Sequence, residues 1–467
     1  MGRSYDFVTD VKSDYALASA DLKVETCTMS LRICILAAGA AGMYCGSCLR
    51  DNTLAAALLK LQHDVTLVPL YTPLRTDTRG VASPEIFYGG INVYLQHASK
   101  LFRYTPRIFD WLFDRPWLLR AAGNMGAGTS PARLAGLTRD ILLGYNGPTY
   151  KELRRLIKFL ADEIRPEVLI LPNLMFIGMA EALGEKLHCP VICELTGEDV
   201  FLDAMNDPDR ENIRELIRAA APHISRFVAT SAYYAEKMAG YLGLPREQIA
   251  VVYPGLADEI VHAPRSDERR TRSSEFVVAS LARVCPDKGT DQLIEAFFQL
   301  KEFSGTAGIR LDYAGYLGPQ YKAWHRILQE RIAVYGLADS MRYRGEVDLA
   351  DKLKMLDAAN LFCVPTRYPE SKGIFALESL SRGVPVIAPA HGTFPELAQR
   401  TGAMHLVPPN DPIALAAAIR DLYSDPARLA ELAARARPAI LESFTGQHMA
   451  EKIAKLCQEA IDARASS

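Results

Sequence analysis

Apolar runs of strand length alternate with helix-like patterns through most of this chain, and this alternation restricts the possible folds more than any other feature. Alternating strands and helices are typical of parallel sheets covered by helices. The sequence therefore predicts an α/β architecture. The strands expected in its first half are Leu31–Ala37, Val65–Leu70, Val168–Pro172, Val191–Leu195, Arg226–Ser231 and Ile249–Tyr253.

An interruption divides the alternation into two halves. Residues 261–274 are polar and charged, as expected for a linker between domains. Strand-like runs resume at Phe276–Ala282 and continue to Val384–Ala390. We therefore expect two Rossmann-like domains, one over 31–260 and one over 275–445. They would face a central cleft at the carboxyl ends of their strands, where open α/β sheets bind ligands.

Three segments fall outside this alternation. Residues 1–30 are polar, unlike a secretory signal, and are interpreted as a flexible extension, with Met29 as an alternative start of translation. An insertion over about 99–150 is rich in cations and tryptophan within 99–120. That stretch fits either a helical insertion that packs its aromatic side chains or peripheral contact with a membrane. Residues 446–467 resemble an amphipathic helix that can cross back to the N-terminal domain.

The composition is that of an ordinary globular protein. Of the 467 residues, 49% are apolar and 23% are charged, and 53 basic against 55 acidic side chains give a net charge of -2. This balance argues against nonspecific nucleic-acid binding. No apolar run reaches the ~20 residues of a membrane span. Nine scattered cysteines favour a reducing compartment. We expect a cytoplasmic protein, with at most peripheral contact at the inner membrane face.

The clearest chemical signal lies between Val364 and Glu378. A strand ends at Pro365, a loop carries Glu370, and Gly373 leads into a helix. The start of a helix presents unpaired N–H groups and a partial positive charge, which suit a phosphate group. Glu378 would lie ~6 Å further along the helix, where a carboxylate can reach ribose hydroxyls. Either glutamate alone would be an ordinary helix-start residue.

Two cations precede this stretch. Arg283 ends a buried strand, and Lys288 with Gly289 opens the next helix. Cations at the carboxyl edge of a strand suit a diphosphate, and they would stabilise the charge that develops as the diphosphate leaves. The alternative is a pair of solvated loop cations.

In combination, these residues resemble the retaining nucleotide-sugar glycosyltransferases of the GT-B fold, of the family-four type called glycosyl transferases group 1. The resemblance rests on Arg283 and Lys288 in LARVCPDKG, on two glutamates with seven residues between them, and on PESKGIFALESLSRGVPVIAPAHGTFPEL. It is strong over about 275–425. It is weaker over 31–255, where it rests on a glycine-rich first turn, VATSAYYAEKMAGYLGL and IAVVYPGL.

The resemblance implies a retaining glycosyltransferase of the hexosyltransferase kind, with no metal or other cofactor. It would move a sugar from a UDP, GDP or ADP sugar to an acceptor that the resemblance does not identify. That acceptor is a glycan, a lipid-linked molecule or a small molecule. Arg283 and Lys288 would contact the donor diphosphate, and Glu370 would contact the transferred sugar. These three are the candidate catalytic residues. Family members retain anomeric configuration by front-face attack, with the leaving phosphate helping to deprotonate the acceptor.

The resemblance also assigns the residues that bind the donor. Glu378 would bind the ribose, and backbone groups at the helix start would hold the phosphates. The segment Arg344–Val347 falls where the family holds the nucleobase. The full donor set is Gly42, Arg283, Lys288, Glu346, Val347, Glu370, Lys372, Gly373, Ile374, Phe375 and Glu378.

The first domain contributes candidates on the acceptor or sugar side. Gly42 belongs to the family's flexible glycine loop, and Gly90 to a second wall of the cleft. Many relatives carry a His followed by Gly-x-Asp after the fifth strand. This chain has Thr196 at the His position and keeps Asp199. Gly90, Thr196 and Asp199 are therefore the candidates here, and the contact of the absent His must be made differently.

Alternative functions follow from single motifs. A nicotinamide dehydrogenase needs G-x-G-x-x-G followed by an acid, and the glycines of the first turn lack this spacing. Asp207 and Asp209 form an Asp-x-Asp, but the surrounding sequence indicates acids in the first turn of a helix. Cys45 and Cys48 are either a redox pair or small residues in a loop that admits a ligand. A GT-B sugar-nucleotide epimerase and a catalytically silent nucleotide-sugar-binding protein also stay open.

Overall fold

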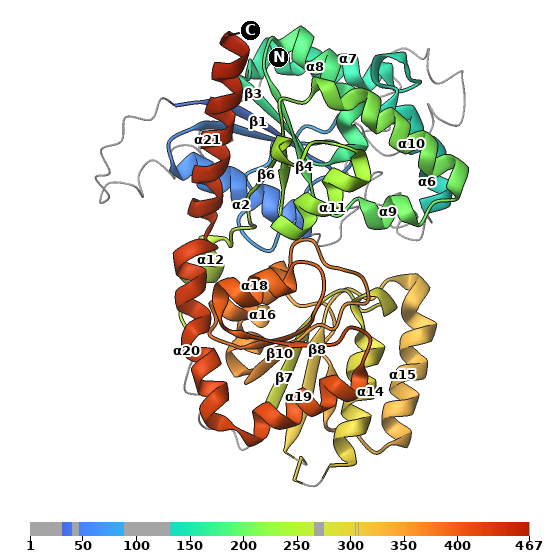
Figure 1. The fold of residues 1–467 in the computed structure, drawn as a ribbon, viewed down its shortest axis with the longest axis vertical. Coiled ribbons are helices and arrows are strands. Elements are labelled where there is room, and N and C mark those ends of the chain that lie inside the picture. Colours follow the sequence, from blue (N-terminus) through green and yellow to red (C-terminus); the bar gives the residue numbers. More distant parts are fainter. Residues whose placement is uncertain are drawn as a thin grey trace, which may run out of the picture. The chain divides into compact units, whose positions relative to one another are not determined.

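The computed structural model describes residues 30–39, 46–87, 131–265, 275–303, 305–306 and 308–466 (Figure 1). The chain forms two compact units, residues 1–255 together with 446–467, and residues 256–445. Each unit contains one parallel sheet of six strands with helices packed on it. The structure thus confirms the predicted α/β class with two Rossmann-like domains.

The first unit is built on a sheet with the strand order β2-β1-β3-β4-β5-β6. In its register, Ile33 of β1 lies between Val65 of β2 and Val168 of β3. Each strand expected in this half is present, because each is an apolar run that the sheet buries. The strands are β1 (Arg32–Ala37), β2 (Asp64–Pro69), β3 (Val168–Leu171), β4 (Val191–Leu195), β5 (Arg226–Ala229) and β6 (Ile249–Val251).

Helices cover both faces of this first sheet. Alternate residues of β1 enter two different cores, Cys34 and Leu36 one of them and Ile33 and Ile35 the other. Successive side chains of a strand point to opposite faces, so both faces are buried. The helices are α2 (Gly46–Lys60), α6 (Pro131–Leu142), α7 (Tyr150–Phe159), α8 (Ala180–Leu187), α9 (Asp199–Asp203), α10 (Asp207–Ala220), α11 (Ala232–Leu242) and α21 (Gly446–Ala465).

The C-terminal helix α21 belongs to this first unit, although the second unit separates it from the rest in sequence. Figure 1 shows it as the long red helix. Its Ile453 and Cys457 lie in the same core as Leu54 of α2. The end of the chain therefore packs on the sheet with which the described part begins.

The second unit is built on a sheet with the order β12-β11-β10-β7-β8-β9. Its strands are β7 (Phe276–Leu281), β8 (Ile309–Ala314), β9 (Met341–Tyr343), β10 (Leu361–Cys363), β11 (Val386–Pro389) and β12 (Met404–Val407). The edge strand β12 was not expected, because His405 interrupts its short apolar run; in the structure only its first and last residues are buried. The helices are α12 (Asp258–Val261), α14 (Thr290–Lys301), α15 (Lys322–Val334), α16 (Leu349–Ala358), α17 (Ile374–Ser381), α18 (Phe394–Thr401), α19 (Pro412–Ser424) and α20 (Pro426–Ser443).

A buried arginine fastens the start of the second unit to its core. Arg382 follows α17 and donates two hydrogen bonds to Asp357, at 2.7 and 2.8 Å. It also donates to the carbonyls of Ala263 at 2.9 Å and Pro264 at 2.8 Å. The chain that enters this unit is thereby held against the ends of α16 and α17.

Short turns of 3-10 or π helix complete the description. They are Gly144–Asn146, Leu160–Ile164, Leu174–Met179, Ala221–His223, Arg246–Gln248, Pro286–Lys288 and Pro319–Tyr321. Among the residues that the structure describes, no helix combines the length and apolarity that crossing a membrane requires. The predicted membrane-contact segment 99–120 lies outside the described residues.

Candidate functional site

Two loops of the second unit leave neighbouring strands and pack tightly together. Strands β7 and β10 are paired in parallel, so the loops that follow them emerge at the same edge of the sheet. Gly289, in the first loop, has a φ of +71°, and a Cβ there would lie 1.9 Å from the carbonyl oxygen of Pro365 in the second. Only glycine fits this position. The sequence signals at 283–289 and 364–373 are thus brought together.

An ion pair joins two of the predicted catalytic residues. The Nζ of Lys288, in the first loop, lies 2.6 Å from Oε2 of Glu370, in the second. The Tyr368 hydroxyl donates to the same carboxylate at 3.1 Å, and the Lys372 N–H donates at 3.4 Å. The Lys288 ammonium also lies 5.0 Å from the ring centre of Phe375, in the first turn of α17. Four predicted site residues therefore form one cluster.

The Glu370 carboxyl is held in its ionised form although it is buried. Burial alone would raise the pKa of Glu370, but the adjacent Lys288 ammonium and the Lys372 N–H favour the carboxylate and lower the pKa to about 2. The carboxylate is therefore charged at any physiological pH.

The ionised Glu370 carboxylate predicts that the stability of the fold depends on pH. The pKa of Glu370 is lower in the folded protein than its ordinary value of 4.5, so its ionised form stabilises the fold above about pH 4.5. That contribution is lost as the pH falls towards 2. We expect the stability advantage of the wild type over Glu370→Gln to shrink between about pH 4.5 and 2, measured by urea unfolding. An advantage that stays constant over this interval would contradict the ion pair.

An arginine that sequence reasoning missed clamps the same two loops. Arg367 donates to both carboxylate oxygens of Asp291, at 2.9 and 2.7 Å. It also donates to the Pro286 carbonyl at 2.7 Å, and its own N–H donates to the Asp287 carbonyl at 2.9 Å. A bidentate hydrogen bond between an arginine and a carboxylate fixes the orientation of the two groups as well as their distance. Arg367 therefore sets the position of the Lys288 loop relative to the Glu370 loop.

The predicted donor residues that remain in the second unit follow the carboxyl ends of its strands or lie on α17. Glu378 is buried on α17, where Lys352 of α16 bonds to it at 2.6 Å. Gly373 precedes α17 in the left-handed conformation, and Ile374 begins the helix. Arg283 is exposed after β7. Glu346, exposed, and Val347, half-buried, follow the edge strand β9, which pairs with β8.

The predicted acceptor-side residues that the structure describes lie after β4 of the first unit. Glu198 is buried and accepts hydrogen bonds from the N–H groups of Thr196, at 2.8 Å, and Gly197, at 2.9 Å. The Tyr234 hydroxyl donates to Asp199 at 2.7 Å, and Lys237 pairs with Asp199. Asp199 is therefore held by α11. Gly42 and Gly90 lie outside the described residues.

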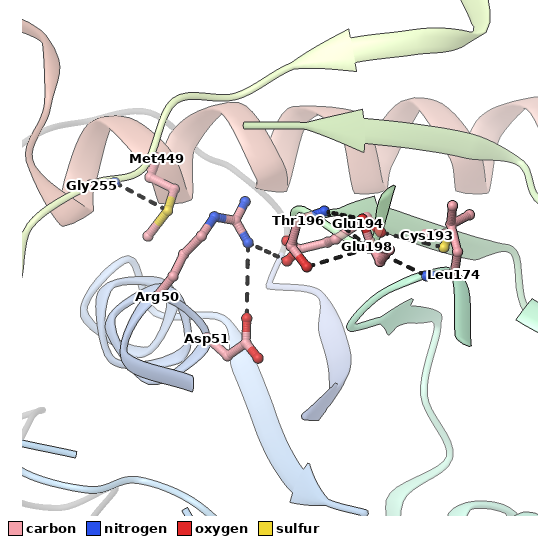
Figure 2. Close-up of polar contacts among 9 residues, drawn as sticks. All are labelled: Arg50, Asp51, Leu174, Cys193, Glu194, Thr196, Glu198, Gly255 and Met449. Atoms are coloured by element: carbon pink, nitrogen blue, oxygen red, sulfur yellow. Dashed lines mark hydrogen bonds and ion pairs between the residues drawn. The ribbon is translucent and has the colours of Figure 1, made fainter. Parts of the chain in front are cut away.

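A buried charge pair, also missed from the sequence, supports this region of the first unit (Figure 2). Arg50, the fifth residue of α2, bonds to Glu194 near the end of β4, and Asp51 lies 3.9 Å from the guanidinium. Burial alone would lower the pKa of Arg50, but Glu194 raises it. The pair joins the helix after the glycine turn to the strand before Thr196.

Other chemically suggestive residues have structural roles. Asp207 and Asp209 lie in the first turn of α10, where the Asn206 side chain accepts from the Asp209 N–H, which confirms the predicted helix start. The Nε2 of His391 bonds to the carbonyl of Thr366, in the loop before Glu370, at 3.0 Å. Within the described ranges, no group of three or more His, Cys, Asp or Glu side chains is placed to hold a metal ion. Cys45 lies outside those ranges.

Comparison with solved structures identifies the class of fold. The chain resembles Anabaena Alr3699/HepE, solved in complex with UDP, with a TM-score of 0.64 and 16% identity over 92% of this chain and 100% of that one. It also resembles sucrose-phosphate synthase from Thermosynechococcus elongatus, with a TM-score of 0.66 and 19% identity over 92% and 99%. These similarities confirm the predicted GT-B fold.

Sequence comparison identifies the family. The model for glycosyl transferases group 1 matches residues 265–439, and the model for a glycosyl transferase 4-like domain matches residues 52–255. The chain belongs to the group 1 glycosyltransferases, as its motifs predicted.

Curated relatives match over part of their length. A candidate colanic acid biosynthesis glycosyltransferase of Escherichia coli K12, WcaL, is 33% identical over 46% of this chain and 52% of its own. D-inositol 3-phosphate glycosyltransferase 1 of Catenulispora acidiphila is 32% identical over 45% of this chain and 52% of its own. This chain thus matches about half the length of these relatives.

Proposed function

We propose that this protein is a retaining glycosyltransferase that moves a sugar from a nucleotide diphosphate sugar to an acceptor hydroxyl without a metal ion. The observation that carries the proposal is the cluster of Lys288 and Glu370 beside the first turn of α17. The names of both curated relatives support glycosyl transfer, and the UDP bound to Alr3699/HepE supports a nucleotide-sugar donor. UDP, GDP and ADP sugars are the donors to test.

In the proposed reaction, the bond between the sugar C1 and the diphosphate oxygen breaks, and a bond from C1 to the acceptor oxygen forms on the same face. The acceptor proton passes to the leaving diphosphate. Lys288 has three N–H donors, so it can bind Glu370 and a phosphate oxygen together. Arg283 and the N–H groups at the start of α17 would add stabilisation of the charge that develops on the diphosphate. Glu370 would contact the transferred sugar.

We also place this reaction in the cytoplasm. Seven cysteines lie in the described part of the chain; all seven are buried, and none of them forms a disulfide with another described residue. Free thiols are the usual state in a reducing compartment. Peripheral contact with the inner membrane face through 99–120 remains part of the proposal.

Donor binding and turnover test the function and separate it from its rivals. We expect one of UDP-glucose, GDP-mannose and ADP-glucose to raise the melting temperature, since a ligand at 100 times its Kd stabilises the fold by ~2.7 kcal/mol. The same sugar nucleotide should be hydrolysed slowly without acceptor. An epimerised nucleotide as the product would indicate the epimerase, and binding with no turnover would indicate a silent binding protein.

The arginine clamp makes a separate prediction for activity. Arg367→Ala should lower turnover by about tenfold, because the Lys288 loop loses its alignment with Glu370. The pair with Asp291 is partly exposed, so the free energy of unfolding should fall by no more than about 1 kcal/mol. Initial rates and urea unfolding of the same preparation measure both effects. Arg331→Ala, which removes a similarly exposed ion pair with Glu295, is the matched control. Equal rates in the two variants would refute the role of Arg367.

A further inference from the structure

A buried lysine is bonded to the glutamate assigned to the ribose. Lys352 lies on α16 and Glu378 on α17, and their side chains are 10% and 9% exposed. The Nζ of Lys352 lies 2.6 Å from Oε1 of Glu378. Isolated buried charges are costly, so each of these groups needs a partner such as the other to remain ionised.

The bond to Lys352 does not use the whole hydrogen-bonding capacity of the carboxylate. An ionised carboxylate offers about four acceptor positions, so it can accept bonds from Lys352 and from other groups at the same time. A hydroxyl bonded to a carboxylate is held about twice as strongly as one bonded to a neutral acceptor. By fixing both the charge and the orientation of Glu378, Lys352 would strengthen any hydrogen bond that this carboxylate accepts.

The place of Lys352 in the chain connects it to the nucleoside end of the donor. Helix α16 follows the segment Arg344–Val347, where the resemblance puts the nucleobase, and Asp348 caps the start of this helix. Helix α17 follows the loop of Glu370, at the sugar end. The Lys352–Glu378 pair thus bonds the nucleobase side of the site to the phosphate side.

We propose that Lys352 is a positioning residue that holds Glu378 for the ribose and thereby sets the preference for ribose over 2′-deoxyribose in the donor. This inference rests on the proposed function. It adds to it a residue that the motifs do not include and a specificity that they do not assign.

The test compares matched ribose and deoxyribose nucleotides. The probes are three pairs: UDP with 2′-deoxy-UDP, GDP with 2′-deoxy-GDP, and ADP with 2′-deoxy-ADP, titrated calorimetrically into the full-length protein. We expect the pair that binds the wild type to show at least tenfold weaker binding of the deoxy form, as expected for a hydrogen bond to a charged group. In Lys352→Met, the ratio of the Kd of the deoxy form to the Kd of the ribose form should fall to about threefold or less.

Three further variants make the result specific. Lys354→Met removes an exposed lysine from the same helix and should keep the wild-type ratio. Glu378→Gln should lower the ratio of the two Kd values. Adding Lys352→Met to Glu378→Gln should not change this ratio further, because Lys352 acts through Glu378. Should Lys352→Met fail to fold, Lys352→Gln, which keeps an N–H donor but no charge, gives the same comparison.

The outcomes separate this inference from the proposed function. A lysine with only a structural role would weaken both members of a pair alike and leave their ratio unchanged. An unchanged ratio in the uncharged variant therefore overturns the inference while the proposed function stands. Failure of all three ribonucleotides to bind the folded wild type overturns both.

Discussion

Lys288→Ala is expected to reduce turnover of the nucleotide-sugar donor by about 100-fold or more. The ammonium lies 2.6 Å from Glu370 and beside the helix start that would hold the diphosphate. Removing one fixed charge that stabilises a leaving group costs about 3 kcal/mol in the transition state, which corresponds to this factor. Initial rates of donor hydrolysis measure the effect for the donor that the thermal-shift panel identifies.

The control for this change is a lysine of the same unit that lies away from the cluster. Lys322→Ala removes an exposed ammonium at the start of α15, and its rate should match that of the wild type. Glu370→Gln should also lose most activity. Near-normal rates in both Lys288→Ala and Glu370→Gln would show that the cluster does not contact the reacting groups.

Arg382→Met is expected to give the largest loss of stability among single changes in the second unit, about 3–5 kcal/mol. The guanidinium is fully buried, and its removal leaves the Asp357 carboxylate and the Ala263 and Pro264 carbonyls without these bonds. Urea unfolding measures the loss.

Two companion variants test the mechanism behind this loss. Asp357→Asn added to Arg382→Met should recover part of the stability, because the double variant no longer buries an unpaired carboxylate. Arg435→Met removes an exposed pair with Glu431 on α20 and should cost no more than about 0.5 kcal/mol. If Arg382→Met also lost no more than about 0.5 kcal/mol of stability, the role of Arg382 in anchoring the start of the second unit would be contradicted.

The fold was largely predictable because its strands are continuous apolar runs and its loops contain glycine at strand ends. The start of α17 was expected near Ile374 and begins there, since Gly373 ends the loop in a conformation that glycine favours. The edge strand β12 was missed because His405 interrupts its short apolar run, as a half-buried edge position allows. Edge strands of this kind carry no uniform pattern of burial.

The supports of the candidate site were not predictable from the sequence. Arg367 pairs with Asp291 across 76 positions, and Arg50 pairs with Glu194 across 144. Neither helical nor strand periodicity relates residues so far apart, and each of them alone is an ordinary charged residue. Motifs therefore located the groups assigned to the donor, whereas the side chains that hold those groups became visible only with the fold.

Calorimetric titration of UDP, GDP and ADP into the wild type and Lys288→Ala tests the central proposal most directly. At least one of these nucleotides should bind the wild type, and its affinity should fall at least tenfold in the variant, because in the proposed site the lost ammonium would contact the diphosphate. The corresponding nucleoside, which has no phosphate, should bind both proteins equally. A diphosphate that binds the two proteins with equal affinity, or no binding of any of the three, would contradict the proposal.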